Sequence, residues 1–423
     1  MSASRLVSLS RKIIKPSSPT PLSHRIHKLS LMDQMGTHSY MGALLFYPKQ
    51  NTTTSMPEPT KISQVLEKSL SKVLTSYYPF AGQVRDNSFV KCNDIGADLS
   101  IVRIDCPMSS IFDHPRTYID NLVLPFDPWF PSTDSLVAAK LCHFECGGVA
   151  LGVCLSHKVS DGCSLGKFLR DWSMVARDSE AKLSPLFNGS SIFKPSNSSS
   201  FQVVADPPLY KNESKRFHFS ASKLKSLKSL TDSTTQIRPT TVEAITAFLY
   251  RCVNTTPSLL IQAVDQRGTS NDALVPADLT GNAILPFVVS ATNKEEMNWE
   301  RLVSELRKGK EKIQDMIKYI ESEEFLCSKV SDIARELNER TSNNDIPMYR
   351  FSSLRRFPSN DMNFGWGRPR QVDISTLPIN MFILMDNQNG DGVEVIVSLE
   401  DGELSALERN GEFLQFASPC LGF

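Results

Sequence analysis

The chain reads VALGVCL over Val149–Leu155 and passes directly into SHKVSDG over Ser156–Gly162. An apolar run of this length, bounded by polar residues, is typical of a strand that is buried on both faces. Leu136–Leu141 is a second, largely apolar run, and Cys146–Gly148 between the two runs favours a tight connection. The sequence therefore predicts a buried hairpin whose second strand carries His157 into a polar loop.

A helix is expected directly after this loop, because Leu165, Phe168, Leu169 and Trp172 recur at helical spacing, with Asp161 near the helix start. Similar patterns predict helices at 62–74, 221–230, 240–253 and 296–321, and strands at 259–264, 381–385 and 393–397. The many charges of the helical segment 296–321 indicate a solvated face.

Residues 184–214 are rich in Ser, Asn and Pro and lack apolar periodicity, which is typical of a linker. A chain of 423 residues is long enough for two domains, since single hydrophobic cores stop growing at about 250 to 300 residues. The sequence therefore predicts an N-terminal domain over 1–183 and a C-terminal domain over 215–423.

The overall charge of the chain excludes some classes of partner. Lys plus Arg and Asp plus Glu both number 46, so no overall field draws the protein to nucleic acid or to an anionic membrane. No run approaches the roughly 18 apolar residues of a membrane span, and none before Pro16 is long enough for a secretory signal. The nine cysteines are scattered, without a Cys-x-x-Cys pair, which indicates a reducing compartment. We expect a cytoplasmic monomer.

A second unusual segment, NFGWG, occupies Asn363–Gly367. Together with the HKVSDG segment it resembles the plant BAHD acyltransferases, whose marks are His-x-x-x-Asp-Gly and a distal Asp-Phe-Gly-Trp-Gly. Asn363 stands where that family has aspartate. Five further segments match the family in order along nearly the whole chain, and these are Leu29–Gln34, Tyr78–Gly82, Phe144–Gly148, Thr241–Ala244 and Gly281–Asn282.

The resemblance implies an α/β fold of two similar domains, each a mixed β-sheet with helices, like chloramphenicol acetyltransferase. The active site would lie in a channel between them, and the strands near 362–385 would pack on the first domain. The family transfers an acyl group from coenzyme A to a hydroxyl or amine, so acyl-CoA is the expected co-substrate and no cofactor is bound permanently. The residues that meet the coenzyme A phosphates cannot be assigned from the sequence.

His157 is the expected catalytic residue. A neutral hydroxyl attacks a thioester poorly, and histidine, with an ordinary pKa of about 6.5, suits the task of general base. Its free ring nitrogen would take the acceptor proton as the oxygen attacks the carbonyl. Collapse of the tetrahedral oxyanion would expel coenzyme A as the thiol, so no acyl-enzyme is required.

Asp161 and Gly162 are the other marked residues of the first segment. The resemblance implies that Asp161 is structural, because the family aspartate points away from the reacting atoms and pairs with an arginine. Arg267 is the one candidate partner in the matching segment 263–268. Gly162 would permit close backbone approach at the channel, although a plain turn glycine is equally consistent with the sequence.

The distal segment contributes Asn363, Gly365 and Gly367 as expected structural residues near the site. Asparagine keeps an acceptor oxygen but loses the charge of the family aspartate. The sequence supports two interpretations of Trp366 equally. Its indole N–H could face the oxyanion, or it could be a buried aromatic at the domain seam.

Competing functions are weaker. No Walker or Gly-x-Gly-x-x-Gly segment and no His and Cys set with metal spacing occurs. GCSLG at Gly162–Gly166 is formally a serine-hydrolase motif around Ser164, but the polar stretch 156–161 separates it from the strand that a nucleophile elbow requires. A non-catalytic binding protein is a further alternative, against which the intact His157 weighs.

The acceptor is predicted from resemblance alone. Ile14–Pro21 and Tyr47–Pro48 are most similar to the branch of the family with alkaloid acetyltransferases, such as vinorine synthase, and the acylsugar acyltransferases. The segments 25–30 and 62–78 favour an acylsugar acceptor, an acylsucrose, with a short or branched acyl group. Alkaloid O-acetylation is the alternative, because acceptor choice depends on pocket residues that the sequence does not place.

Overall fold

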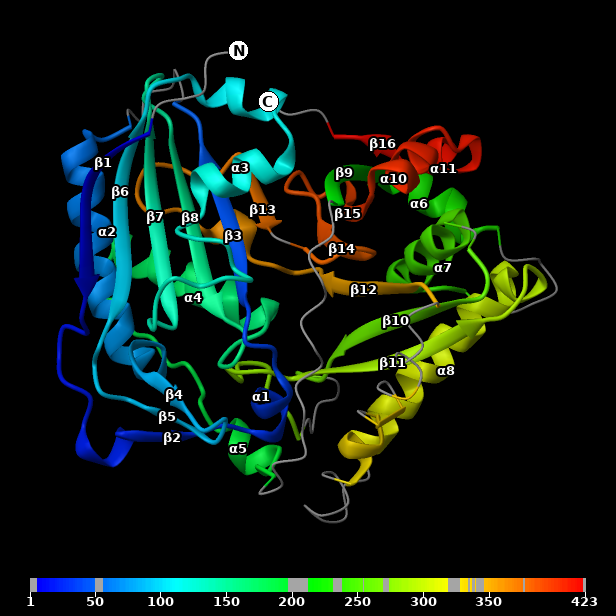
Figure 1. Cartoon of the computed structure of the whole chain (residues 1–423), viewed down its shortest axis with the longest axis horizontal. Coiled ribbons are helices and arrows are strands. Elements are labelled where there is room, and N and C mark those ends of the chain that lie inside the picture. Colours follow the sequence, from blue (N-terminus) through cyan, green and yellow to red (C-terminus); the bar gives the residue numbers. More distant parts are fainter. Residues whose placement is uncertain are drawn as a thin grey trace.

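The computed structural model describes residues 6–49, 56–196, 212–230, 238–253, 255–268, 274–318, 328–333, 335–336, 339, 346–375 and 377–420. Two halves lie side by side, each built on a β-sheet with helices packed against it (Figure 1). The N-terminal half contains most of one sheet, and the C-terminal half contains the other.

The first sheet has six strands, and the predicted hairpin lies at its centre. Its strands in spatial order are β1 (Leu6–Ile14), β6 (Ala97–Ile104), β7 (Val137–Phe144), β8 (Val149–Ser156), β3 (Tyr40–Tyr47) and β13 (Gln371–Ser375). Every residue of β7 and β8 is buried. The hairpin that the sequence predicts is confirmed.

Helices cover both faces of this sheet, which is why its central strands are apolar throughout. The predicted helices α2 (Pro59–Ser76) and α4 (Gly162–Arg177) pack on one face and share an apolar cluster with alternate strand residues. The other face packs against α3 (Arg116–Val123). Asp161 is the N-cap of α4, so His157 and Asp161 stand on the short loop between strand and helix.

The second sheet has seven strands and is covered on one face by helices. The strands in order are β11 (Ile284–Ala291), β10 (Ser258–Asp265), β12 (Met348–Leu354), β14 (Met381–Asp386), β15 (Gly392–Glu400), β9 (Asn212–Ser220) and β16 (Ser418–Pro419). The helices are α6 (Ala221–Lys228), α7 (Thr241–Val253), α8 (Trp299–Lys318), α10 (Asp401–Glu408) and α11 (Gly411–Phe416). Their apolar residues join one cluster with this sheet.

The charged helix α8 differs from its sequence expectation. It buries Trp299, Leu302, Leu306 and Ile313 in the second half, so only part of its surface is solvated. Apolar residues at helical spacing lie between its charges, and composition alone hides such a stripe. The predicted end of this segment, 319–321, lies outside the described residues.

Several smaller elements complete the fold. A three-stranded sheet combines β2 (Ile26–Lys28), β5 (Phe89–Lys91) and β4 (Gln83–Arg85). Short 3₁₀ helices lie at Leu22–His24, Tyr78–Ala81, Met108–Asp113, Glu295–Met297 and Ser359–Asp361. The short helix α1 (Leu31–Met35) sends Leu31 and Met32 into the apolar cluster of the second half. Among the described residues, no helix combines the length and the apolar character that crossing a membrane requires.

The predicted linker 184–214 contains more structure than its composition indicates. The short helix α5 (Gly189–Ile192) lies within it, and the carbonyl of the fully buried Phe193 accepts from Leu31 N over 3.0 Å. Strand β9 begins at Asn212, inside the predicted linker. Residues 197–211 lie outside the described residues. The first part of the predicted linker is therefore anchored to α1.

In the described part of the range 362–385, which leaves out residue 376, β13 crosses to the first sheet and β14 does not. Strand β13 pairs antiparallel with β3, with Asp373 opposite Leu44. The expectation for 362–385 as a whole was too broad, because β14 pairs with β12 and β15 in the second sheet. Nothing in the apolar pattern of β14 distinguishes a strand of one sheet from a strand of the other.

Buried charges fix the crossing strand. Asp373 accepts from Arg116 Nη1 on α3 over 2.6 Å and forms a second ion pair with Arg216 on β9. Burial alone would raise the pKa of Asp373, but the two guanidinium groups lower it to about 2. Arg216 also pairs with Glu394 on β15. The cluster therefore joins the crossing strand to both halves.

A face of α4 that contains Gly162 and Gly166 packs against the end of β12 and the segment that follows it. A Cβ on Gly162 would stand 2.5 Å from Leu354 Cδ2, and one on Gly166 would stand 2.8 Å from Phe357. Gly162 thus allows close packing of α4 against a side chain of the second half. The sequence left open whether Gly162 permits close approach at the channel or is a plain turn glycine, and the close approach that the structure shows is to the side chain of Leu354.

We predict that Gly166→Ala destabilises the protein by about 1 to 3 kcal/mol, because the added methyl must displace Phe357 or Pro358 in a packed seam. Gly402→Ala on α10 is the matched control, because a Cβ there meets nothing within 4 Å. It should leave stability unchanged or raise it by up to about 1 kcal/mol. Thermal melting of both variants checks this, and equal melting temperatures for the two would contradict the packing argument.

Candidate active site

His157 directly follows the last residue of β8. Its backbone N–H donates to Ser39 O over 3.0 Å, in the segment that leads into β3. Its carbonyl oxygen accepts from Asn282 Nδ2 over 2.8 Å, in the segment that leads into β11. The backbone of His157 is therefore held from the first sheet and from the second.

The imidazole of His157 is oriented by the side chain of Asn282. The Nδ2 group of Asn282 donates to Asp33 Oδ1 over 2.9 Å and to His157 O over 2.8 Å. Its Oδ1 then faces His157 Nδ1 at 3.1 Å. Because a carbonyl oxygen only accepts, Nδ1 must carry the proton. This leaves a lone pair on Nε2, the nitrogen that a general base needs.

Asp33, on α1, is the next residue in this chain of contacts. It is 4% exposed. One carboxylate oxygen accepts from Ser30 N and Ser30 Oγ, forming the capping box of α1. The other accepts from the backbone N and from Nδ2 of Asn282, each over 2.9 Å. A buried carboxylate thus contacts the residue that contacts His157.

Asp161 points away from the imidazole and into the seam between the halves. Its Oδ1 accepts from Ser164 N over 2.9 Å, which caps α4. Its Oδ2 accepts from Arg267 Nη1 over 2.8 Å and from Ala283 N over 3.0 Å. Burial would raise the pKa of Asp161, but the Arg267 guanidinium and these N–H donors hold it below its ordinary value. The ion pair implied by the family resemblance is present.

Arg267 is buried and completely hydrogen-bonded. Burial would lower its pKa, but Asp161 and Asp265 raise it. The acceptors of its five N–H groups are Leu279 O, Asp161 Oδ2, Asp265 Oδ1, Ser164 Oγ and Gly281 O. Breaking the pair would leave several buried groups unsatisfied, which is the expensive case.

Ser164 belongs to this network and does not have the surroundings of a nucleophile. It lies in the first turn of α4 and is fully buried. Its Oγ donates to Gly281 O over 2.8 Å and accepts from Gly281 N over 3.0 Å. It also accepts from Arg267 Nη2 over 3.2 Å. Ser164 is therefore not placed to act as the nucleophile of a serine hydrolase.

The loop at Gly281–Ala283 connects these contacts to His157. Gly281 has a φ of 133°, a backbone conformation that residues other than glycine rarely adopt. In this conformation its N–H and its C=O both bond to Ser164 Oγ. Ala283 N is held by Asp161. Asn282 lies between these two anchored residues, and its side chain is therefore held against the imidazole of His157.

Asn363 stabilises its own loop. Its Oδ1 accepts from Gly365 N over 2.9 Å and from Gly367 N over 3.0 Å. Both glycines have a φ of 108°, and this left-handed backbone lets their N–H groups converge on one oxygen. Arg177 donates to the carbonyl of Asn363 and not to its side chain. The loop therefore uses the acceptor oxygen that asparagine shares with aspartate.

Trp366 lies far from His157. Its ring centroid is 6.1 Å from that of Tyr47, which pairs with Val149 at the start of β8. Tyr40, seven residues earlier on β3, pairs with Ser156 at the other end, so about 23 Å of strand separates the two ends. Trp366 is also 8% exposed and stacked on Phe364. The oxyanion interpretation does not fit this position, and the buried-aromatic interpretation does.

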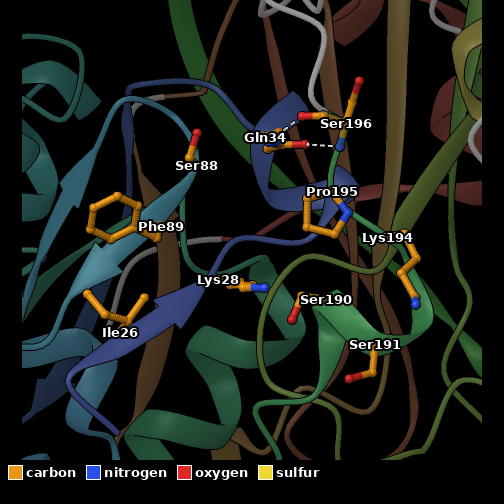
Figure 2. A pocket seen from close by; sticks show the side chains of 10 residues that line it. All are labelled: Ile26, Lys28, Gln34, Ser88, Phe89, Ser190, Ser191, Lys194, Pro195 and Ser196. Atoms are coloured by element: carbon orange, nitrogen blue, oxygen red, sulfur yellow. Dashed lines mark hydrogen bonds between the residues drawn. The ribbon is translucent and has the colours of Figure 1, made fainter. Parts of the chain in front are cut away.

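A cavity of about 550 Å³ has Gln34 of α1 in its lining. Figure 2 shows Gln34, the neighbour of Asp33, bonded through its amide to the backbone of Ser196. Lys28, Ser190, Ser191 and Lys194 are among the polar side chains that line it. Its lining includes neither His157 nor Asn282, so it is separate from the loop that carries His157.

Sequence reasoning gave Asn282 and Asp33 no role. Both lie in segments that match the family, and Ser30-x-x-Asp33 is a recognisable helix start. Nothing local indicates that Asp33 meets Asn282, which is 249 positions away. Among the described residues, no group of three or more His, Cys, Asp or Glu side chains could hold a metal ion.

Comparison with known proteins extends over the whole chain. The sequence model of the Transferase family matches residues 6–414. Acylsugar acyltransferase 3 of Solanum lycopersicum is 37% identical over 98% of this chain and 98% of its own length.

Two solved structures share the fold. Vinorine synthase has a TM-score of 0.81 at 28% identity, over 99% of this chain and all of its own. F. graminearum TRI101, in complex with coenzyme A and T-2 mycotoxin, has a TM-score of 0.70 at 17% identity, over 93% of this chain and 99% of its own. The predicted two-domain α/β fold is confirmed.

We predict that Asp161→Asn lowers stability by about 3 to 5 kcal/mol, because asparagine keeps the cap of α4 but leaves the buried Arg267 charge without its main partner. Since the folded-state pKa of Asp161 is depressed, its contribution is complete above the ordinary value of 3.8 and is lost as pH falls through the folded value. Denaturant unfolding at several pH values measures both effects.

Asp265→Asn is the matched control for Asp161→Asn. Its carboxylate also bonds Arg267 but is 36% exposed, and burial raises its pKa despite Arg267. Removing that charge should change stability by less than about 1 kcal/mol. An Asp161→Asn protein with a normal melting temperature but no activity would contradict the structural role.

We predict that Asn363→Asp raises stability by about 1 kcal/mol and leaves kcat unchanged. The carboxylate would accept the same two glycine N–H groups in stronger, charge-assisted bonds, close to Arg177. Melting temperature and kcat measured together test this. A rise in kcat of about a hundredfold, the scale of a catalytic group, would show that the position acts in the chemistry.

Proposed function

The chain belongs to the Transferase family, among the plant BAHD acyltransferases, and on this premise we propose that it moves an acyl group from coenzyme A to a hydroxyl with His157 as general base. The observation that carries this role is the contact between His157 Nδ1 and Asn282 Oδ1, which leaves Nε2 free to accept a proton. Asp161 is occupied by Arg267 and Ala283 and does not orient the imidazole directly.

The proposed reaction is a direct transfer. Nε2 of His157 removes the proton of the acceptor hydroxyl while its oxygen attacks the thioester carbonyl. The tetrahedral intermediate then expels coenzyme A, and the imidazolium returns the proton to the thiolate sulfur. Nδ1 keeps its proton throughout, because Asn282 Oδ1 accepts it in both charge states of the ring.

Acyl-CoA is the proposed donor, supported by the family and by the coenzyme A in the complex of a protein with the same fold. For the acceptor we favour an acylsugar, an acylsucrose, with a short or branched acyl group. Identity of 37% to acylsugar acyltransferase 3 supports this choice. The close likeness to vinorine synthase supports alkaloid O-acetylation as the second candidate.

A substrate panel separates these candidates. Purified protein is offered acetyl-CoA and branched short-chain acyl-CoAs with sucrose, partially acylated sucrose and indole alkaloids. Thiol release and ester formation are measured together. We expect coenzyme A and ester in equal amounts with an acylated sucrose. Ester formation with an alkaloid alone would select the second candidate, thiol release without acceptor would indicate a hydrolase, and no turnover with any pair would indicate a binding protein.

We predict that His157→Ala lowers kcat by about 10² to 10⁴, the usual worth of a general base, while the melting temperature stays near that of the wild type. His24→Ala is the control, because it removes an exposed imidazole that only stacks on Tyr78. It should keep full activity. Wild-type kcat in a folded His157→Ala protein would overturn the base assignment.

A further inference from the structure

Two binary choices decide whether His157 can act as a base. A neutral imidazole carries its proton on Nδ1 or on Nε2, and an asparagine amide can face a neighbour with its oxygen or its NH₂ group. If the NH₂ group of Asn282 faced His157, Nδ1 would have to accept and Nε2 would carry the proton. The ring would then have no lone pair for the acceptor hydroxyl.

The carboxylate of Asp33 determines which end of the Asn282 amide faces His157. In the observed orientation, Asn282 Nδ2 donates to Asp33 Oδ1 over 2.9 Å. A rotated amide would place its oxygen at that distance from a carboxylate oxygen, and two acceptors without a hydrogen between them repel. The carbonyl of His157, at 2.8 Å from Nδ2, opposes rotation in the same way. Asn282 and Asp33 are 6% and 4% exposed, so water has little access to relieve the conflict.

Helix capping does not account for the whole geometry of Asp33. The capping box of α1 uses Oδ2 alone, through Ser30 N and Ser30 Oγ. Oδ1 of Asp33 takes no part in the cap and accepts hydrogen bonds from the backbone N and from Nδ2 of Asn282. The cap fixes the rotation of the carboxylate, and the remaining oxygen is thereby aimed at Asn282.

We infer that Asp33 is a positioning residue that acts through Asn282 to hold His157 in the Nδ1–H tautomer. The inference rests on the proposed function, because it concerns the nitrogen that accepts the proton. Asp33 touches no reacting atom. Its role is to give the Asn282 amide one orientation, and that orientation gives the imidazole one tautomer.

Nitrogen-15 NMR of histidine-labelled protein reads the tautomer without an activity assay. At a pH where the ring is neutral, we expect the wild-type His157 to show an unprotonated Nε2 and a protonated Nδ1. The His157→Ala spectrum assigns the signals. In Asp33→Asn only the carbonyl of His157 still constrains the amide of Asn282, so the rotated amide and a protonated Nε2 should appear beside the wild-type form. A wild-type pattern in folded Asp33→Asn would overturn the inference.

Ser30→Ala is the matched control for the loss of the helix cap. It removes the hydroxyl that binds Oδ2, but it keeps the bond from Ser30 N to Oδ2, which still sets the rotation of the carboxylate, and both bonds between Oδ1 and Asn282. We expect a lower melting temperature with an unchanged tautomer and kcat. Asp33→Asn should instead lower kcat by at least about tenfold, within the range of a general base, with KM little changed. Equal losses of kcat in the two variants would assign the effect to capping and overturn the inference.

Asn282→Leu keeps the test decisive if Asp33→Asn does not fold, because it leaves the cap of α1 untouched. Leucine cannot accept from Nδ1, so we expect the Nε2–H form that free imidazole prefers. An Nδ1–H ring in this variant would contradict the proposal. The NMR result can be distinguished from the test of the general base. An active His157→Ala protein would overturn the proposed function. An unaltered tautomer in Asp33→Asn, together with an inactive His157→Ala protein, would overturn only the role of Asp33.

Discussion

The guanidinium of Arg267 donates all five of its N–H groups to acceptors from both halves of the molecule, and the site depends on this contact. Asp161, its ion-pair partner, stands at the start of α4, whereas Arg267 follows β10. Both side chains of this ion pair are 3% exposed or less, and removing one partner of such a buried pair strongly destabilises a protein. The seam between the sheets is therefore fixed beside the loop that carries His157.

This ion pair reaches His157 through the loop that it anchors. Arg267 holds the carbonyls of Leu279 and Gly281, and Asp161 holds Ala283 N. Asn282, the residue between, then orients the imidazole. The carboxylate four residues after the histidine can thus be required for activity without touching a reacting group. The Arg116, Asp373 and Arg216 cluster fixes the crossing strand at another point of the seam.

The sequence predicted the features that follow from local patterns. The apolar run 149–155 predicted a strand buried on both faces, and the spacing from Leu165 to Trp172 predicted α4. The pair of Asp161 with Arg267 came from the family resemblance. Contacts between Asp33, His157 and Asn282 were missed, because 125 and 249 positions separate the partners and only the closed fold joins them. The sequence left two interpretations of Trp366 open, because a motif does not reveal which end of a sheet it will contact.

A comparison of Arg267→Gln, Asp161→Asn and the double variant tests the central claim most directly, with kcat and unfolding free energy measured for each. Arg267 contacts no reacting group, so both single variants should lose stability and kcat together. The double variant should lose much less than the sum, as residues of one network do. A stable, inactive Asp161→Asn protein beside an Arg267→Gln protein with wild-type kcat would show that Asp161 acts in the chemistry, and would contradict the account.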